Sequence, residues 1–315
     1  HLSQLEEISL SRSKVSLDKL KVKKNKSIRQ LTLQYVSLSV IPRQIKRLKK
    51  LEYLSLQFND FHSVPKFLRK FKSLKEFSLS GNYLDAYALH FEKLDQLTTL
   101  RLNQCNLYAF PESILSLPNL TELQLSGNKI KVLPDNINAL QELRSLAIYK
   151  NQIAELPLSF YELDQLEILD AYFNNIERVA PEIHQMQRLK ILYISNNAIF
   201  SLPETLGELV NLTQLYVHHN RLSDVPQSLN QLEKLTVLHL NNNRLTEFPS
   251  QILALRQLED IDLSDNDLDI IPTEIIDLPK LRLLFVQGNP WSKEGKDHIT
   301  ELDKATANSS LIFNH

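Results

Sequence analysis

The sequence predicts an α/β solenoid of stacked repeats, and two observations carry this prediction. An apolar residue returns every 23 positions from Leu5 to Leu281, through thirteen repeats without insertion or deletion. Each repeat begins with alternating apolar and polar residues, as a half-buried strand does, and then widens its apolar spacing. Such a fixed period is typical of one small structural element stacked many times. We therefore expect a parallel concave sheet of about thirteen short strands, with turns and short helices on the convex side.

Residues 120–142 show the elements of one repeat in order. Leu123 and Leu125 flank a polar residue and predict the strand. Pro134 follows Leu133; it fixes φ and has no N–H to donate, so the return path should consist of turns and short helical pieces. One repeat buries too little apolar surface to offset the entropy lost on ordering its backbone. Neighbouring repeats must therefore cover each other, and both ends of the array need caps.

An asparagine follows the strand in most repeats, at a turn that stacking should bury. A buried amide needs partners for its donors and its acceptor, and the backbone of neighbouring loops can supply them. We interpret these residues as a structural asparagine ladder: Asn59, Asn82, Asn128, Asn151, Asn174, Asn197, Asn220, Asn243, Asn266 and Asn289. Cys105, the single cysteine, takes this position in the fifth repeat, so we expect a buried thiol that replaces the amide.

The pattern LxxLxLxxNxLxxLPxxIxxL resembles the leucine-rich repeat family in its 23-residue form, over nearly the whole chain. The resemblance implies a curved, horseshoe-shaped solenoid, and the chain is similar to bacterial members of the family. Extracellular animal members usually carry cysteine-rich caps, which a chain with one cysteine cannot form. We therefore expect a cytoplasmic protein, or a bacterial protein that is surface-exposed or secreted.

The regularity of the repeat pattern divides the chain into three predicted segments. Residues 1–27 are predicted to be a degenerate N-terminal repeat or cap, and residues 28–291 the leucine-rich repeat array. Residues 292–315 are predicted to be a C-terminal cap, with a polar helix that begins at Ser292 and a short final strand. The fourth repeat lacks its proline, and we expect a longer helical turn there. Because the sequence begins at His1 and not at Met, we also expect that a leader or an upstream segment is missing.

Charge is unevenly distributed along the chain, although the formal net charge is −1. Residues 1–75 contain 18 Lys and Arg against 5 Asp and Glu, whereas residues 76–315 contain 18 against 32. Basic residues gather on the return segments of the second and third repeats: Lys46, Arg47, Lys49, Lys50, Lys66, Arg69, Lys70 and Lys72. We interpret them as a solvated convex flank and do not expect nucleic-acid binding, because aromatic residues are not interleaved with them. No apolar run approaches the roughly 18 residues that a membrane-spanning helix needs.

No catalytic constellation stands out from the repeat pattern, and we expect neither a cofactor nor a small-molecule substrate. Residues 262–274 only loosely resemble a calcium loop, because Asp267 stands where glycine is required. His218, His219 and His239 could approach one another, but no carboxylate or thiol is evidently placed to complete a zinc site. A pH-dependent contact through these imidazoles is more consistent with the sequence than a metal.

The concave face carries the clearest functional signal. Side chains two, four, six and seven positions after the first apolar residue of each repeat should point there, because strand side chains alternate. In repeats seven to eleven, 8 of these 20 positions are aromatic or His, against 33 of 315 residues in the whole chain. Equivalent side chains of adjacent repeats lie about 4.8 Å apart and should form rows. The predicted partner-binding residues are Tyr149, Asp170, Tyr172, Phe173, Tyr193, Tyr216, His218, His219 and His239.

Three functions are compatible with this sequence. The one we favour is a noncatalytic interaction module that holds a partner protein or peptide through the aromatic and His cluster. The second is the recognition domain of a larger signalling enzyme or bacterial effector, such as a GTPase or a ubiquitin ligase. The third is binding of an anionic surface or a nucleic acid by the basic end, which salt should weaken steeply. Tyrosines at exposed strand positions can also reflect β propensity alone.

Overall fold

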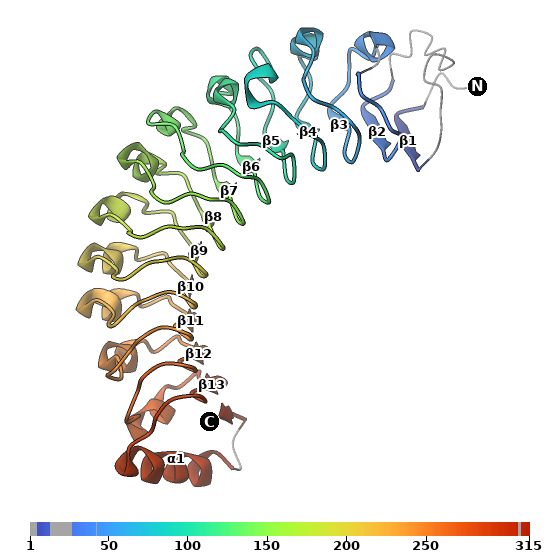
Figure 1. Ribbon diagram of the computed structural model, residues 1–315. Helices are drawn as coiled ribbons and strands as arrows, with labels where there is room; N and C mark the ends of the chain where they lie inside the picture. Colours follow the sequence, from blue (N-terminus) through green and yellow to red (C-terminus); the bar gives the residue numbers. More distant parts are fainter. Residues whose placement is uncertain (1–4, 13–26, 42, 308–309) are drawn as a thin grey trace. The chain divides into compact units, whose positions relative to one another are not determined.

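The computed structural model describes residues 5–12, 27–41, 43–307 and 310–315. The chain forms two compact units, His1–Gln152 (unit 1) and Ile153–His315 (unit 2). Within each unit the strands are parallel and follow one another in sequence order, and each coil has its strand at one edge and its short helix at another (Figure 1). The predicted α/β solenoid is confirmed.

Unit 1 contains seven strands among its described residues. They are β1 Glu7–Ser11, β2 Gln30–Gln34, β3 Tyr53–Ser55, β4 Glu76–Ser78, β5 Thr99–Arg101, β6 Glu122–Gln124 and β7 Ser145–Ala147. Short 3-10 helices follow the strands from β2 to β6. They are η2 Arg43–Arg47, η3 Lys66–Lys70, η4 Ala86–Ala88, η5 Glu112–Ser116 and η6 Ile137–Ala139.

Unit 2 repeats the same alternation and closes with an α-helix and a final strand. Its strands are β8 Ile168–Asp170, β9 Ile191–Tyr193, β10 Gln214–Tyr216, β11 Val237–His239, β12 Asp260–Asp262, β13 Leu283–Phe285 and β14 Ile312–Asn314. Its helices are η7 Leu158–Glu162, η8 Pro181–Gln185, η9 Glu204–Glu208, η10 Gln227–Gln231, η11 Ser250–Ala254, η12 Thr273–Asp277 and α1 Lys293–Thr306.

The strand register reproduces the sequence period. Leu54 lies opposite Phe77 in unit 1, and Leu215 lies opposite Leu238 in unit 2, in each case 23 residues further along the chain. The central residue of these strands points inward and is fully buried. The flanking residues point to the opposite side of the sheet, which we call the open face. Because the offset equals the repeat length, equivalent side chains become neighbours in rows.

The asparagines bind the loops of adjacent repeats together, as Asn128 shows. Its Nδ2 donates hydrogen bonds to the carbonyls of Leu102, at 2.9 Å, and of Leu125, at 2.6 Å. Its Oδ1 accepts from the backbone N–H groups of Cys105, at 2.9 Å, and of Leu107, at 3.1 Å. One side chain thus satisfies four backbone groups that stacking has removed from water.

Cys105 is fully buried, as its place in the ladder predicts. Its Sγ donates to the carbonyls of Leu79, at 3.3 Å, and of Asn103, at 3.4 Å. Burial raises the pKa of this thiol to about 12, so the thiolate that reactivity would require is disfavoured.

One position of every repeat adopts a left-handed backbone, which the sequence analysis did not anticipate. It is the seventh residue after the first apolar residue of each repeat, where the chain turns out of the strand, and its φ lies between 50° and 74°. L-residues reach this conformation at a cost of about 1–2 kcal/mol, and glycine avoids most of that cost. The residues are Arg12, Tyr35, Phe58, Gly81, Gln104, Gly127, Lys150, Phe173, Asn196, His219, Asn242, Asp265 and Gly288.

The return segment of the fourth repeat is shorter than expected. Where a proline precedes the helix, as Pro65 and Pro111 do, the 3-10 helix runs for five residues. In the fourth repeat Ala88 stands at the proline position, and η4 begins earlier, after Asp85, whose side chain accepts a hydrogen bond from the N–H of Tyr87; this helix has only three residues. The expectation of a longer helical turn was wrong, because the aspartate closes a local turn instead.

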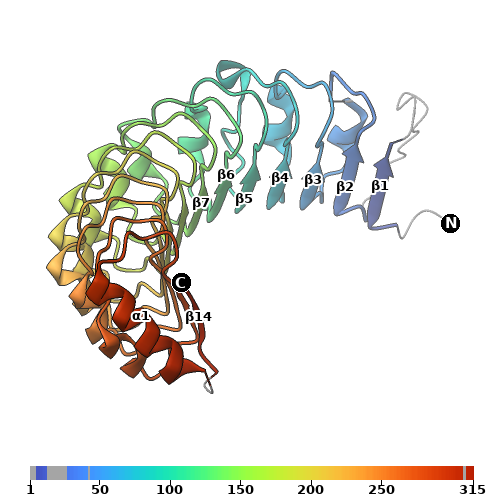
Figure 2. The same ribbon diagram turned by 60° about the horizontal axis from the view of Figure 1, so that its bottom comes forward.

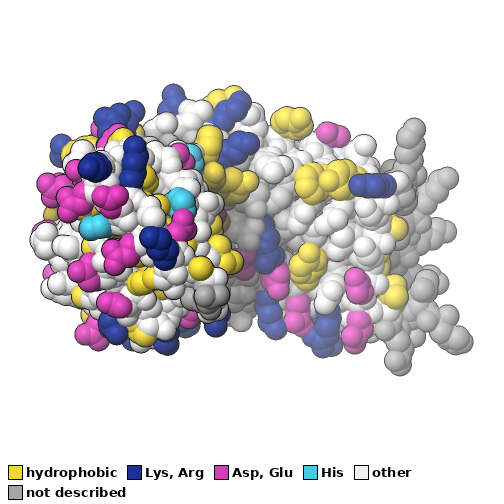
Figure 3. Space-filling model, turned by 90° about the horizontal axis from the view of Figure 1, so that it is seen from below, with side chains coloured by type: hydrophobic (Ala, Val, Ile, Leu, Met, Phe, Trp, Pro, Cys, Tyr) yellow, Lys and Arg dark blue, Asp and Glu magenta, His cyan; other side chains and the backbone are white. Residues whose placement is uncertain are grey.

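Helix α1 covers the end of unit 2, next to β14 (Figure 2). The Ser292 hydroxyl accepts the N–H of Gly295 at 3.1 Å and caps the helix. Ile299 and Leu302 are the buried apolar side chains of this helix, and Leu284 lies opposite Phe313 where β14 pairs with β13. Basic and acidic side chains are interspersed over this end (Figure 3). The division into an N-terminal cap, an array and a C-terminal cap stays a prediction, and residues 13–26 of the first segment lie outside the described residues.

Candidate functional site

Two registered rows of side chains cross the open face of unit 2. The first row contains Ile168, Ile191, Gln214, Val237, Asp260, Leu283 and Ile312. The second row lies two residues further along each strand and contains Asp170, Tyr193, Tyr216, His239, Asp262, Phe285 and Asn314. The parallel ladder places these side chains side by side at the spacing of neighbouring strands.

The centre of the second row is a continuous aromatic stack. The rings of Tyr193 and Tyr216 are stacked, with centroids 4.6 Å apart and planes 19° apart. His239 meets Tyr216 edge-on, at 4.9 Å and 82°. All three side chains are half-buried, so each ring is partly covered by neighbouring residues and partly exposed to solvent. The geometry combines the offset-stacked and the edge-to-face arrangements that aromatic pairs favour.

A second aromatic group lies at the ends of β8 and β10. The ring of Tyr172 is 5.7 Å from Phe173 and 6.2 Å from His218. His218 in turn lies 5.2 Å from His219 and 6.4 Å from His239, which connects this group to the stack. The Phe173 side chain is 51% exposed and therefore presents a large apolar surface to solvent.

The predicted site residues therefore fall in both units. Asp170, Tyr172, Phe173, Tyr193, Tyr216, His218, His219 and His239 share the open face of unit 2. Tyr149 belongs to unit 1, where its side chain is half-buried. From here on, the open-face cluster means the eight residues of unit 2.

Burial shifts the ionisation of several of these groups. Burial lowers the pKa of the His218 imidazole to about 4, and His219 and His239 act in the same direction. His218 is therefore neutral near pH 7 and does not supply the pH dependence that the sequence suggested. Burial raises the pKa of the Asp170 carboxyl, while the N–H of Tyr172 opposes the shift by donating to Oδ1 at 3.3 Å. Burial also raises the pKa of the Tyr216 hydroxyl, with Tyr193 and Asp260 adding to the shift.

Asp260 is a functional candidate that the sequence analysis missed. Its Oδ2 lies 3.2 Å from Nε2 of His239, so a carboxylate does stand beside one of the three histidines. Among the described residues, no group of three His, Cys, Asp or Glu side chains could hold a metal ion. The available signal was Asp260 itself, because aspartate is depleted in strands and β12 carries two.

The open face of unit 1 has a different character. Arg101 lies between Glu76, at 3.1 Å, and Glu122, at 3.3 Å, so its charges are compensated within the sheet. Small side chains such as Ser55 and Ser78 are buried there, and the stacked pair of unit 1, Tyr35 and Phe58 with ring centroids 4.5 Å apart, lies at the turns after β2 and β3. The basic residues of η2 and η3 are exposed on the short-helix side of the coils.

Models of leucine-rich repeat sequences match this chain in three overlapping places. A model described as a leucine-rich repeat region matches residues 135–244, and two described as leucine rich repeat match residues 227–290 and 119–140. Together they span residues 119–290, which is more than half of the chain. None of the curated protein sequences matches it. Among the described residues, no helix has both the length and the apolar character needed to cross a membrane.

Solved structures of similar fold come from bacteria and plants. A leucine-rich repeat protein of Leptospira interrogans is 25% identical, with a TM-score of 0.73 over 100% of this chain and 91% of the other. An internalin of Listeria monocytogenes is 23% identical, with a TM-score of 0.83 over 99% and 87%. The ectodomain of a plant membrane receptor kinase from Arabidopsis thaliana, solved in complex with Casparian strip integrity factor 2, is 26% identical, with a TM-score of 0.68 over 84% and 36%.

Proposed function

Because the chain belongs to the leucine-rich repeat family, whose members are typically noncatalytic binding modules, we propose that it is a protein-interaction module. In this proposal the open face of unit 2 holds a partner protein or an extended peptide. The plant receptor ectodomain that is similar to this chain was solved in complex with Casparian strip integrity factor 2, and a partner bound to a structure of this fold supports the proposal.

The observation that carries the proposal is the continuous aromatic stack of Tyr193, Tyr216 and His239 on an otherwise uncovered sheet face. Rigid aromatic side chains with few rotatable bonds lose little entropy when they are covered, and they dominate the energetics of many interfaces. Phe173 adds an exposed apolar side chain beside the same cluster. An open face that spans several strands suits a protein surface or an extended chain better than an enclosed small molecule.

The test is a selection of peptides on the immobilised full chain from a displayed library of random sixteen-residue peptides. The selected peptides are then measured by fluorescence anisotropy against a triple variant, Tyr172→Ala, Tyr193→Ala and Tyr216→Ala. Hot-spot residues contribute about 2 kcal/mol or more each, so affinity should fall by about a hundredfold or more.

A matched control removes three exposed tyrosines of unit 1, with Tyr83→Ala, Tyr87→Ala and Tyr108→Ala. These side chains are 61%, 84% and 64% exposed and lie outside the open-face cluster. The control should bind as the original protein does. Equal binding by both triple variants would contradict the proposal. Binding that instead collapses with salt and needs the basic residues of η2 and η3 would favour an anionic ligand.

A further inference from the structure

We propose that the partner presents a cationic side chain, arginine or lysine, that enters a recess on the open face of unit 2 and binds the carboxylate of Asp260. The inference rests on the proposed function, since it specifies the chemistry of the segment that the open-face cluster would hold. It names a subsite next to the aromatic stack and a preference for one type of ligand side chain.

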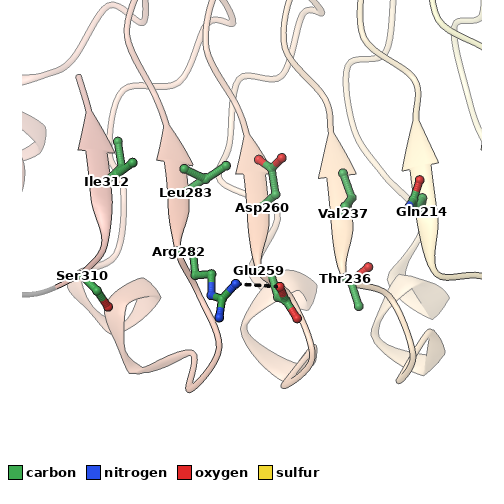
Figure 4. Close-up of a pocket in the computed structure, with 9 residues that line it drawn as sticks. All are labelled: Gln214, Thr236, Val237, Glu259, Asp260, Arg282, Leu283, Ser310 and Ile312. Carbon is green, nitrogen blue, oxygen red and sulfur yellow. Dashed lines mark ion pairs between the residues drawn. The ribbon is translucent and has the colours of Figure 1, made fainter.

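The recess lies across β10 to β14 and has a volume of about 720 Å³. Val237, Leu283 and Ile312 contribute apolar side chains from three strands, and Asp260 stands in the same row, between Val237 and Leu283 (Figure 4). The strand starts lie along the lower rim, where Glu259 and Arg282 face each other (Figure 4). The apolar side chains on both sides of Asp260, in a recess whose other lining residues are polar or charged, match a side chain with an aliphatic stem and a positive head.

Asp260 is the acidic group of this recess that is left for a ligand. Glu259 already faces Arg282, at 3.8 Å. The Oδ2 of Asp260 lies 3.2 Å from His239, but its Oδ1 has no hydrogen-bond partner among the described residues, although it is shielded from solvent. A carboxylate with one unpaired, shielded oxygen is incompletely stabilised, and a guanidinium or ammonium group that approaches the exposed part of the Asp260 side chain would stabilise its charge with a charge-assisted hydrogen bond.

The sequence of the first row makes Asp260 conspicuous. The other members of this row are isoleucines, a valine, a leucine and a glutamine, which strands and apolar contacts favour. Asp260 and Asp262 also lie on the same face of one three-residue strand, where two like charges repel each other. Asp260 is the one charged residue of this row in unit 2, and a charged residue among apolar neighbours is a departure of the kind expected at functional positions.

Charge complementarity across the whole face identifies the sign of the ligand. The open-face positions of β8 to β13, counted as in the sequence analysis, hold Asp170, Asp260, Asp262 and Asp265 but no Lys or Arg. In unit 1 the corresponding acidic residues Glu76 and Glu122 are paired with Arg101. Among the described residues, no Lys or Arg forms an ion pair with these four aspartates of unit 2, and only His239 lies beside one of them, Asp260. The neighbouring ring of Tyr216 can add a cation–π contact.

The experiment uses the peptides selected on the full chain for the proposed function. Those that bind the open-face cluster should be enriched in Arg or Lys next to an apolar or aromatic residue. One enriched peptide is synthesised with its arginine and with citrulline, the neutral isostere, and both are titrated against the original protein, Asp260→Asn and Asp262→Asn. Asp262→Asn is the matched control because it removes the same charge from the same strand, outside the recess.

The expected result is a loss of about tenfold to a hundredfold in affinity on Asp260→Asn, as for a hydrogen bond to a charged group. Exchange of arginine for citrulline should produce the same loss in the original protein and almost none in Asp260→Asn, because the two changes remove one shared contact. Asp262→Asn should change affinity by less than about threefold, the size of a screened surface charge effect.

Failure of the cationic subsite can be distinguished from failure of the proposed function. Peptides that need the tyrosines but carry no cation, or carry an acidic residue instead, would overturn this inference and leave the proposed function standing. The same holds if citrulline weakens binding equally in the original protein and in Asp260→Asn. If no selected peptide depends on Tyr172, Tyr193 and Tyr216, the proposed function and the inference fail together. Circular dichroism spectra and melting curves of the variants exclude unfolding as the cause of a loss.

Discussion

Replacement of Asn128 by alanine is the most direct test of what holds adjacent repeats together. Asn128 is 7% exposed, and its amide makes four hydrogen bonds of 3.1 Å or less to backbone groups of the fifth and sixth repeats. In Asn128→Ala the N–H groups of Cys105 and Leu107 lose their acceptor inside the stack. At about 1–3 kcal/mol for each stranded donor, with a partial contribution from the two carbonyls, the free energy of unfolding should fall by about 3–5 kcal/mol.

Two further variants separate the hydrogen bonds from other effects of the substitution. In Asn128→Cys the thiol can still donate to the carbonyl of Leu102, as Cys105 does to the equivalent carbonyl of Leu79 one repeat earlier, but sulfur is a weak acceptor. The loss should therefore be smaller than for alanine. Asn136→Ala removes an exposed asparagine of the same repeat whose side chain caps no helix. It should change the free energy of unfolding by no more than about 0.5 kcal/mol.

The assay is equilibrium unfolding in urea, followed by far-ultraviolet circular dichroism. Circular dichroism is needed because the single tryptophan, Trp291, lies in unit 2, whereas Asn128 lies in unit 1. Variants are compared at a common m-value, since a change in m would signal a loss of cooperativity between repeats. A loss below about 1 kcal/mol for Asn128→Ala, or one equal to that of Asn136→Ala, would refute the assignment of stability to the ladder.

Three other expectations concern single residues. Lys150 has a φ of 54°, a left-handed conformation that glycine adopts without strain. Lys150→Gly should therefore raise the free energy of unfolding by up to about 1 kcal/mol, whereas Lys150→Ala should not. Equal effects of the two substitutions in thermal melts would contradict the proposed backbone strain. Cys105, whose pKa is raised to about 12 by burial, should resist iodoacetamide at pH 8 until the protein is denatured, and rapid native labelling would disprove its burial. His218 has a folded-state pKa of about 4, below its usual 6.5, so the unfolded chain binds the proton more readily. The free energy of unfolding should therefore fall as pH decreases from 6.5 to about 4, and His218→Gln should show a shallower fall; identical pH profiles would count against this shift.

The rows of the open face could be predicted because a solenoid converts sequence distance into spatial distance. Tyr193, Tyr216 and His239 are separated by 23 residues each, and the register offset of the strands is also 23. Each repeat contacts mainly its neighbours, so the residues that meet on adjacent strands follow directly from the repeat length. The placement of Asn128 between two loops follows from the same argument.

Other features depended on details that the repeat consensus does not contain. Three of the five glycines, Gly81, Gly127 and Gly288, occupy the left-handed position. The other ten repeats have other residues there, so the glycines indicate a left-handed backbone only once the φ angles are known. The short η4 arises from one aspartate that closes a turn. Asp260 lies one repeat beyond the stretch in which aromatic residues are enriched, so counting residues of that kind does not find it.

The sequence by itself determined the repeat length, the strand register and the set of side chains that face outward, because periodicity requires only that identical elements stack. Only the tertiary structure decided which outward groups remain without a partner. Whether His239 turns toward Asp260, and whether Asp260 Oδ1 is shielded without a donor, depends on ring orientations and on the volume of neighbouring side chains. Both depend on how neighbouring side chains pack, because packing fixes the rotamers and determines which polar atoms water can reach.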